Sequence, residues 1–225
     1  MAFRKILGYK AYSRMGAGTP PVPPYTPVKW VKGTGASIDT GIKPTINTEV
    51  YFELFIPSRN SGKYMSYEFG SENPNYSPSE IRSFSFQYFT EANSTGFIDT
   101  DFIYYYGNKG KVGVSKPNGG QINTFKFNKD GFWLNGNFIV APEPIPVEDP
   151  VPENLNIYLM GCNGSKINYT DGYYGWVSAY IKDEDVLLRD FKAAKDNDGK
   201  YCFYDLVSKQ FFYPISGNLT GEDLP

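Results

Sequence analysis

The sequence contains no histidine and only two cysteines among its 225 residues. Without histidine, neither a Ser-His-Asp or Cys-His catalytic system nor a zinc site with histidine ligands can be assembled. The commonest general acid or base at neutral pH is missing as well. Catalysis by carboxylates or lysine remains open, so the missing histidine excludes many classes of enzyme but not all of them.

The two cysteines, Cys162 and Cys202, are far apart in the sequence and form no CxxC pattern. We expect two buried free thiols, because an unpaired cysteine packs as a small apolar side chain. A disulfide is the alternative if the strands that carry them are neighbours, and spacing alone does not separate the two states. No cofactor or metal is predicted, because acids such as Asp99 and Asp171 lack the loop spacing that defines a calcium site.

Long apolar runs and an excess of one charge are missing too. No run reaches the roughly 18 residues of a membrane-spanning helix, and the first residues lack the apolar core of a secretory signal peptide. The 22 basic and 24 acidic residues nearly balance, so a nucleic-acid partner is not indicated. Aromatic residues make up 17% of the chain, beside 23 glycines and 17 prolines, and this combination favours short strands joined by tight turns.

Residues 1–28 differ in composition from the rest of the chain. Basic and apolar side chains are mixed here without an acidic residue, and a run of prolines from Pro20 to Pro27 follows. Such prolines favour a stiff, extended spacer. We therefore predict an anchoring arm that binds a partner protein through Phe3, Arg4, Lys5, Ile6, Leu7, Tyr9, Lys10, Tyr12 and Arg14.

Strand patterns recur at short spacing from Val28 onward. The clearest is residues 48–56, TEVYFELFI, in which apolar and polar residues alternate. Two short strands, 28–32 and 37–42, are expected before it, separated by a Gly-Thr-Gly turn. Asn135-Gly136 predicts a hairpin with a type I′ turn. Further strands are predicted at 65–69, 83–89, 102–106, 111–115, 124–128, 132–134, 138–140, 156–160, 173–182, 186–194, 200–204 and 210–213.

The connections between these strands are too short for crossover helices. Residues 141–155 hold five prolines and cannot form a central strand, and the only helical segment we expect is a short turn near residues 76–82. Strands that follow one another so closely pair antiparallel, in a sandwich or a barrel. The sequence therefore predicts an all-β protein.

Motifs towards the two ends of the chain resemble those of a known family. The first is Ile38-Asp39-Thr40-Gly41, followed by Lys43-Pro44 and Asn47-Thr48, and the second runs from Gly172–Trp176 through Leu188–Phe191 and Tyr204–Val207 to Phe211–Tyr213. Together, over residues 28–217, they resemble the laminin-G-like, concanavalin A-like jelly-roll domains of bacteriophage virion proteins and gut-bacterial surface proteins. The chain departs from the family pattern at Ser37-Ile38, where the family has Gln-Tyr, and in lacking a proline after Phe191.

The resemblance implies an antiparallel jelly-roll sandwich and a structural role in a virion. We expect residues 1–28 to be the arm, 29–217 the sandwich and 218–225 a C-terminal tail. The expected function is capsid decoration, head fibre or tail-associated protein, made in the host cytoplasm and attached to a capsid or tail protein by the arm. A homotrimer is the expected oligomer. A bacterial surface carbohydrate-binding module is the alternative, and a glycanase is a third hypothesis.

The acidic residues do not form a catalytic pattern. Glycanases with this fold carry carboxylates at alternate positions of one strand, which places both acids in one cleft. Here Glu49 and Glu53 are expected on the solvent face of their strand, and Asp99 and Asp101, the best remaining pair, have no third group nearby. The acids of the family motifs are expected to cap turns or to pair with arginine. We therefore predict a protein that is not an enzyme.

Adhesion to host or mucosal glycans is a further hypothesis, compatible with the structural role in a virion. Lectin sites combine exposed aromatic rings with asparagine and aspartate side chains that bind sugar hydroxyls. One predicted loop has this content, with Asn163, Asn168, Tyr169, Asp171, Tyr173 and Tyr174 as the candidate residues. Tyr104–Tyr106 form a second aromatic cluster. Ordinary packing is the alternative for both groups.

Overall fold

The computed structural model describes residues 23–57, 64–72, 83–90, 92–93, 96–97, 101–107, 109–114, 119–140, 155–161 and 174–225. Every regular element within these ranges is a β-strand, and every strand pairing among them is antiparallel. The prediction of an all-β, antiparallel protein is therefore confirmed. The helical turn expected near residues 76–82 lies outside the described residues.

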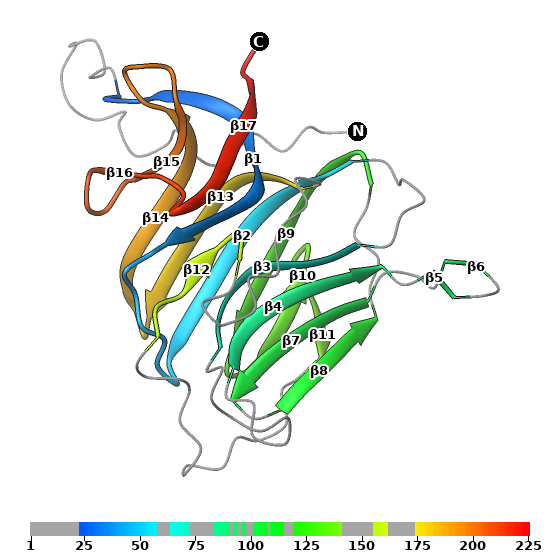
Figure 1. The fold of residues 1–225 in the computed structure, drawn as a ribbon. Helices are drawn as coiled ribbons and strands as arrows, with labels where there is room; N and C mark the ends of the chain where they lie inside the picture. Colours follow the sequence, from blue (N-terminus) through cyan, green and yellow to red (C-terminus); the bar gives the residue numbers. More distant parts are fainter. Residues whose placement is uncertain are drawn as a thin grey trace, which may run out of the picture.

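The strands form two layers (Figure 1). The first layer, sheet A, contains in spatial order β11 (Asn137–Val140), β10 (Gly131–Leu134), β9 (Gln121–Asn128), β2 (Thr48–Ile56), β13 (Gly175–Asp183), β14 (Val186–Lys195), β15 (Tyr201–Asp205) and β16 (Gln210–Phe212). The second, sheet B, contains β12 (Tyr158–Leu159), β3 (Tyr64–Glu72), β4 (Ser83–Thr90), β7 (Asp101–Gly107) and β8 (Lys109–Val114). A small ribbon of β5 (Ala92–Asn93) and β6 (Gly96–Phe97) stands apart from both layers in Figure 1.

One long strand joins the two layers. β1 (Thr26–Asp39) pairs with β13 and β14 in sheet A and with β12 in sheet B. The sequence predicted two short strands here, separated by a turn at Gly-Thr-Gly. Instead the chain stays extended and the ladder with β17 shifts its register between Thr34 and Ser37, as it does at a β-bulge. The bulge bends the strand without ending it, so that a single strand reaches both sheets.

The sandwich also extends beyond both boundaries expected from the sequence. β17 (Ser216–Asp223) pairs with β1 along most of its length, in the segment expected to be a C-terminal tail. At the other end, β1 begins at Thr26 and Val28 is 6% exposed, so the last residues assigned to the arm belong to the sandwich. The glycines and polar residues of β17 have low strand propensity, and it forms because β1 offers a free edge for pairing.

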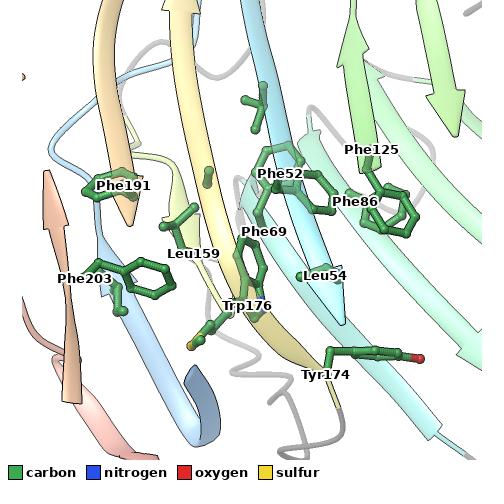
Figure 2. Close-up of a cluster of buried hydrophobic side chains, with 14 of the residues drawn as sticks. Phe52, Leu54, Phe69, Phe86, Phe125, Leu159, Tyr174, Trp176, Phe191 and Phe203 are labelled. Atoms are coloured by element: carbon green, nitrogen blue, oxygen red, sulfur yellow. The ribbon is translucent and has the colours of Figure 1, made fainter. Parts of the chain in front are cut away.

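The core lies between the two layers and is rich in aromatic rings (Figure 2). The Phe52 ring of β2 is 5.0 Å from the ring of Phe125 and 5.4 Å from that of Trp176, both in sheet A. Across the sandwich, it is 5.3 Å from Phe86 of sheet B, in an edge-to-face arrangement. Such pairs stabilise a core beyond the burial of their area, by about 0.5–1.5 kcal/mol each.

Two local predictions can be checked directly. Asn135 and Gly136 have φ angles of 52° and 79°, which confirms the type I′ turn between β10 and β11. Cys202 is a buried free thiol whose Sγ lies 3.6 Å from the carbonyl oxygen of Ala194, and burial raises its pKa to about 12. Cys162 lies outside the described residues. The described part of the chain contains no helix long and apolar enough to cross a membrane.

Candidate functional site

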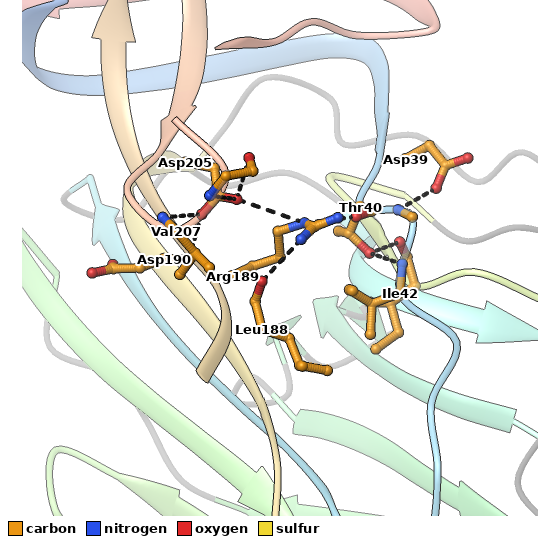
Figure 3. A network of polar contacts seen from close by, with 11 residues as sticks. Asp39, Thr40, Ile42, Leu188, Arg189, Asp190, Asp205 and Val207 are labelled. Atoms are coloured by element: carbon orange, nitrogen blue, oxygen red, sulfur yellow. Dashed lines mark hydrogen bonds and ion pairs between the residues drawn. The ribbon is translucent and has the colours of Figure 1, made fainter. Parts of the chain in front are cut away.

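The motifs that carry the family resemblance meet at one end of the sandwich (Figure 3). Arg189 of β14 donates from Nε to the carbonyl oxygen of Thr40, at 3.0 Å, and its Nε lies 3.7 Å from Oδ2 of Asp205. Asp205, at the end of β15, is fully buried. It accepts hydrogen bonds from the backbone N–H of Asp190 and from the backbone N–H and the hydroxyl of Ser208. Arg189 therefore links three distant segments of the sequence.

Asp39 and Thr40 complete this network at the end of β1. Oδ1 of Asp39 accepts a hydrogen bond from the backbone N–H of Gly41 at 2.8 Å, and the buried hydroxyl of Thr40 donates to the carbonyl oxygen of Ile157 at 2.7 Å. The expectation that these acids cap turns or pair with arginine is confirmed for Asp39 and Asp205. The motif residues in this network thus hold the fold together rather than face a ligand.

The pKa of Asp205 reflects the same network. Burial alone would raise it, but the backbone N–H groups of Asp190, Val207 and Ser208 and the Ser208 hydroxyl favour the charged carboxylate. Their combined effect outweighs burial, so the pKa lies below its ordinary value. Asp205 is therefore a structural carboxylate that stays ionised at neutral pH.

The outer face of sheet A has a different chemistry. Along β2, side chains alternate between buried and half-buried positions, so that Glu49, Tyr51, Glu53 and Phe55 point away from the core. Neighbouring strands add polar and aromatic residues at the matching positions. The outer face of sheet A, rather than the motif network, therefore carries polar and aromatic side chains of the kinds that bind ligands in other proteins.

Two tyrosines occupy the middle of this face. Tyr51 and Tyr180 lie opposite each other on β2 and β13, with ring centroids 4.9 Å apart and planes 7° from parallel. The Tyr51 hydroxyl donates to Glu53 at 3.0 Å, and the Tyr180 hydroxyl donates to Glu49 at 3.2 Å. Because the rings cover each other's faces, they offer edges and hydroxyls to the solvent rather than a flat surface.

The two tyrosine hydroxyls are held in their protonated form at neutral pH. Burial, followed by the nearby charge of Glu49, raises the pKa of Tyr180 to about 12. Burial and the charge of Glu53 likewise raise the pKa of Tyr51. Glu53 also accepts a hydrogen bond from Ser178 at 2.7 Å, and Glu49 accepts one from Asn128 at 2.9 Å. Both carboxylates are therefore already bound by protein donors.

A second aromatic group lies towards the β11 edge of the face. Trp133 packs edge-to-face against Phe138, with ring centroids 5.5 Å apart, and Phe138 is 55% exposed. The ammonium group of Lys126 lies 3.9 Å from the centre of the Trp133 ring and 3.8 Å from Glu49. This group is close to neutral overall, because Lys126 and Glu49 offset each other.

A third aromatic group lies at the other end of β2, and we call Trp30, Phe55 and Ile122 the Trp30 platform. The indole of Trp30 and the ring of Phe55 are 6° from parallel, with centroids 6.4 Å apart. Phe55 lies opposite Ile122 of β9, which is 47% exposed. The platform therefore spans β1, β2 and β9, and β13 crosses beneath it.

Gly175 explains why the indole can lie across β13. Gly175 is paired with Phe55, and a Cβ atom built on it would lie 2.7 Å from Cγ of Trp30. Any larger residue at this position would push the indole away from the sheet. Because residue 175 has no side chain, the indole of Trp30 can pack closely over β13, next to Phe55.

Two lysines flank the platform. The ammonium group of Lys32 lies 4.7 Å from the centre of the Trp30 ring, and that of Lys29 lies 5.8 Å from the centre of the Phe55 ring. Lys29 also forms an ion pair with Glu222 of β17, at 2.7 Å. Cation–π contacts of this kind contribute about 0.5–1 kcal/mol when exposed.

Glu49 and Glu53, the two acids on the outer face of β2, can be compared with the catalytic pair of a glycoside hydrolase. Glu49 and Glu53 are four residues apart on one strand, so their Cα atoms are about 13 Å apart. Paired catalytic carboxyl groups in these enzymes are roughly 5–9.5 Å apart. Among the described residues, no group of three or more acidic or cysteine side chains gathers where it could hold a metal ion.

Most of the site residues predicted from the sequence lie outside the described part of the chain. This holds for the arm residues 3–14, for 163–173 of the predicted glycan loop and for Asp99. Tyr174 is described and is 2% exposed, in the core beside Trp176 (Figure 2). Because alternate residues of a strand share a face, Tyr174 and Trp176 point inward and Gly175 points outward. Tyr174 therefore does not offer its ring to a sugar.

The sequence analysis did not identify the Trp30 platform. The alternation of TEVYFELFI could have placed Phe55 on the solvent face, but nothing in the sequence paired it with Trp30. In the sequence, residues 163–173 precede Tyr174 and Gly175, and Gly175 lies beneath the indole.

Comparisons with known proteins add little to this description. No protein-family model matches the sequence, and no curated protein matches it. Among solved structures, the chain is similar to full-length tailspike protein 2 of the Escherichia coli O157:H7 bacteriophage CAB120, with a TM-score of 0.48 and 11% sequence identity. The match covers 76% of this chain and 27% of that one, so this chain spans about a quarter of the tailspike's length.

Proposed function

We propose that this chain is a non-catalytic glycan-binding domain of a bacteriophage particle, attached to the particle by its N-terminal arm. The resemblance of the two sequence motifs to virion proteins supports the phage origin. The antiparallel sandwich on which those motifs meet supports the type of domain. Capsid decoration, head fibre and tail attachment are the positions that such a domain would occupy.

The Trp30 platform is the observation that carries the binding function. Sugar rings have apolar faces that pack on flat aromatic surfaces, and their hydroxyls need donors and acceptors at the rim. The near-parallel, offset rings of Trp30 and Phe55 supply aromatic surface at this end of the sheet. Ser178, Glu53 and Tyr51, further along the same face, supply polar groups that are already held in place.

A glycan microarray, followed by calorimetry on the strongest ligands, tests this function. The full chain should bind one class of glycan, and Trp30→Ala should weaken that binding at least 10-fold while the variant remains folded at the temperature of the measurement. Phe138→Ala removes an exposed ring at the far edge of the same sheet and serves as the matched control. Binding that is lost equally in both variants would place the site elsewhere.

The attachment of the arm is tested separately. A chain lacking residues 1–22 keeps all of β1 and should fold as the full chain does. It should no longer be captured by phage particles or by their capsid and tail proteins. Normal incorporation of the shortened chain would contradict the role of the arm. Capture by bacterial surface glycans alone, with no virion partner, would favour the alternative of a bacterial surface module.

The absence of catalysis is a proposal that a product assay can overturn. The full chain should release no new reducing ends from any polysaccharide that it binds, over an incubation of many hours. If it does release them, Glu49→Gln and Glu53→Gln identify whether the two carboxylates of the outer face take part.

A further inference from the structure

The exposed side of the Trp30 ring is already occupied by a positive charge. One side of the indole lies over Gly175, and the ammonium group of Lys32 lies 4.7 Å from the ring centre. A sugar that packs on this ring must take the place of the ammonium group. The displaced ammonium group of Lys32 then needs another partner beside the bound sugar.

Within the described residues, Lys32 has no acidic partner. Lys29 is paired with Glu222, and Glu53, the acid next to the platform on β2, accepts hydrogen bonds from Tyr51 and Ser178. Among the described residues, two lysines, Lys29 and Lys32, and two acids, Glu222 and Glu53, therefore border the platform, and of the two lysines only Lys32 forms no ion pair. Elsewhere on the face, Lys126 lies near Glu49 and Lys192 is paired with Asp190 at 2.8 Å.

We propose that the Trp30 platform binds an acidic sugar, one whose ring carries a carboxylate or a sulfate group. The ring packs on Trp30 and Phe55, and Lys32 moves from the indole to the anionic group of the ligand. This inference rests on the proposed glycan-binding function and specifies its ligand. A neutral sugar would displace Lys32 without giving it a new partner, and so it would bind more weakly.

The test compares glycans that differ only in the acidic group. Three matched pairs are suitable: sialyllactose and lactose, oligogalacturonate and its methyl ester, and a sulfated galactose oligomer and its unsulfated parent. Affinities are measured by calorimetry with the full chain at low and at moderate salt. The acidic member of at least one pair should bind about 3- to 10-fold more tightly, and the difference should shrink as salt rises. The pair that shows the preference identifies the anion.

Lys32→Met isolates the contribution of the charge. Methionine keeps much of the apolar stem but carries no charge, so the acidic and neutral members should bind this variant equally. Lys182→Met is the matched control, because Lys182 also lies over an aromatic ring, 5.1 Å from the centre of Tyr180, but away from the platform. It should keep the full preference.

The outcomes separate this inference from the function on which it rests. If glycans bind but each pair binds equally, or if Lys32→Met keeps the preference, the acidic ligand is overturned and glycan binding stands. If the chain binds none of the six glycans and none on the array, both are overturned.

Discussion

The two faces of β2 show how one strand serves both stability and binding. The inward residues Val50, Phe52, Leu54 and Ile56 are at most 4% exposed and belong to the apolar core cluster. The outward residues Glu49, Tyr51, Glu53 and Phe55 are half-buried, and each has a specific partner on a neighbouring strand. The inner-face residues contribute by packing in the core, whereas the outer-face residues contribute by hydrogen bonds and aromatic contacts. Substitutions on the two faces should therefore have different consequences.

The largest expected effect is on the inner face. Phe52→Ala removes a ring that contacts Phe86, Phe125 and Trp176 and leaves a cavity between the sheets. It should lower the free energy of unfolding by about 3–5 kcal/mol, measured by urea denaturation. Phe55→Ala, three positions further along the same strand, should cost clearly less, because its ring is half-exposed. Equal costs would contradict the distinction between the faces.

Asp205→Asn tests the polar network at the end of the sandwich. The amide keeps the shape but cannot accept every hydrogen bond that the buried carboxylate accepts, so the variant should be about 2 kcal/mol less stable at pH 7. The folded pKa of Asp205 lies below its ordinary value. Its stabilisation is therefore full above about pH 4 and is lost as pH falls through the folded pKa. The difference between the two proteins should shrink below about pH 4, and a constant difference would show that Asp205 is not ionised in the folded protein.

Gly175→Ala links the two faces, since Gly175 points outward between the buried Tyr174 and Trp176. The new Cβ would collide with Trp30, so the variant should lose about 1–3 kcal/mol of stability and most of its glycan binding. If the collision is the cause, Gly175→Ala should cost little further stability in a Trp30→Ala background, and the double variant should bind no better than Trp30→Ala alone. Losses that simply add would place the strain elsewhere.

The smallest effect is expected at the tyrosines of the outer face. Tyr180→Phe removes a half-exposed hydrogen bond to Glu49 and should cost about 0.5–1.5 kcal/mol at neutral pH. The folded pKa of Tyr180 is raised to about 12. Tyr180 therefore stabilises the fold below its ordinary pKa of about 10 and loses this contribution as pH rises to 12. Raising the pH from about 10 to about 12 should therefore lower the free energy of unfolding less in Tyr180→Phe than in the original protein.

The parts of the fold that follow from local patterns were predictable from the sequence. The alternation of TEVYFELFI placed β2 and its core face, and Asn135-Gly136 fixed a hairpin, because both depend on neighbouring residues. β17 and the continuity of β1 were not predictable, because they depend on pairing between the two ends of the chain. The polar and glycine-rich sequence of β17 gives no sign of a strand by itself.

Some residues of the candidate site were likewise predictable from local patterns, and others were not. Glu49 and Glu53 were correctly expected on the solvent face, since strand alternation decides this. The Trp30 platform requires a tryptophan of β1 to lie over a glycine of β13 beside a phenylalanine of β2, and no local pattern connects the three. Tyr174 was assigned to an exposed loop, but its position two residues before the buried Trp176 places it in the core.

The most direct test of the account follows the tryptophan side chains during glycan binding. The chain has three tryptophans, and their indole N–H groups give separate signals in a nitrogen–proton spectrum that Trp→Phe variants assign. Titration with a bound glycan should shift the signal of Trp30 strongly and leave those of Trp133, at the far edge, and Trp176, in the core, nearly unchanged. A glycan that binds while shifting Trp133 and not Trp30 would contradict the assignment of the site to the Trp30 platform.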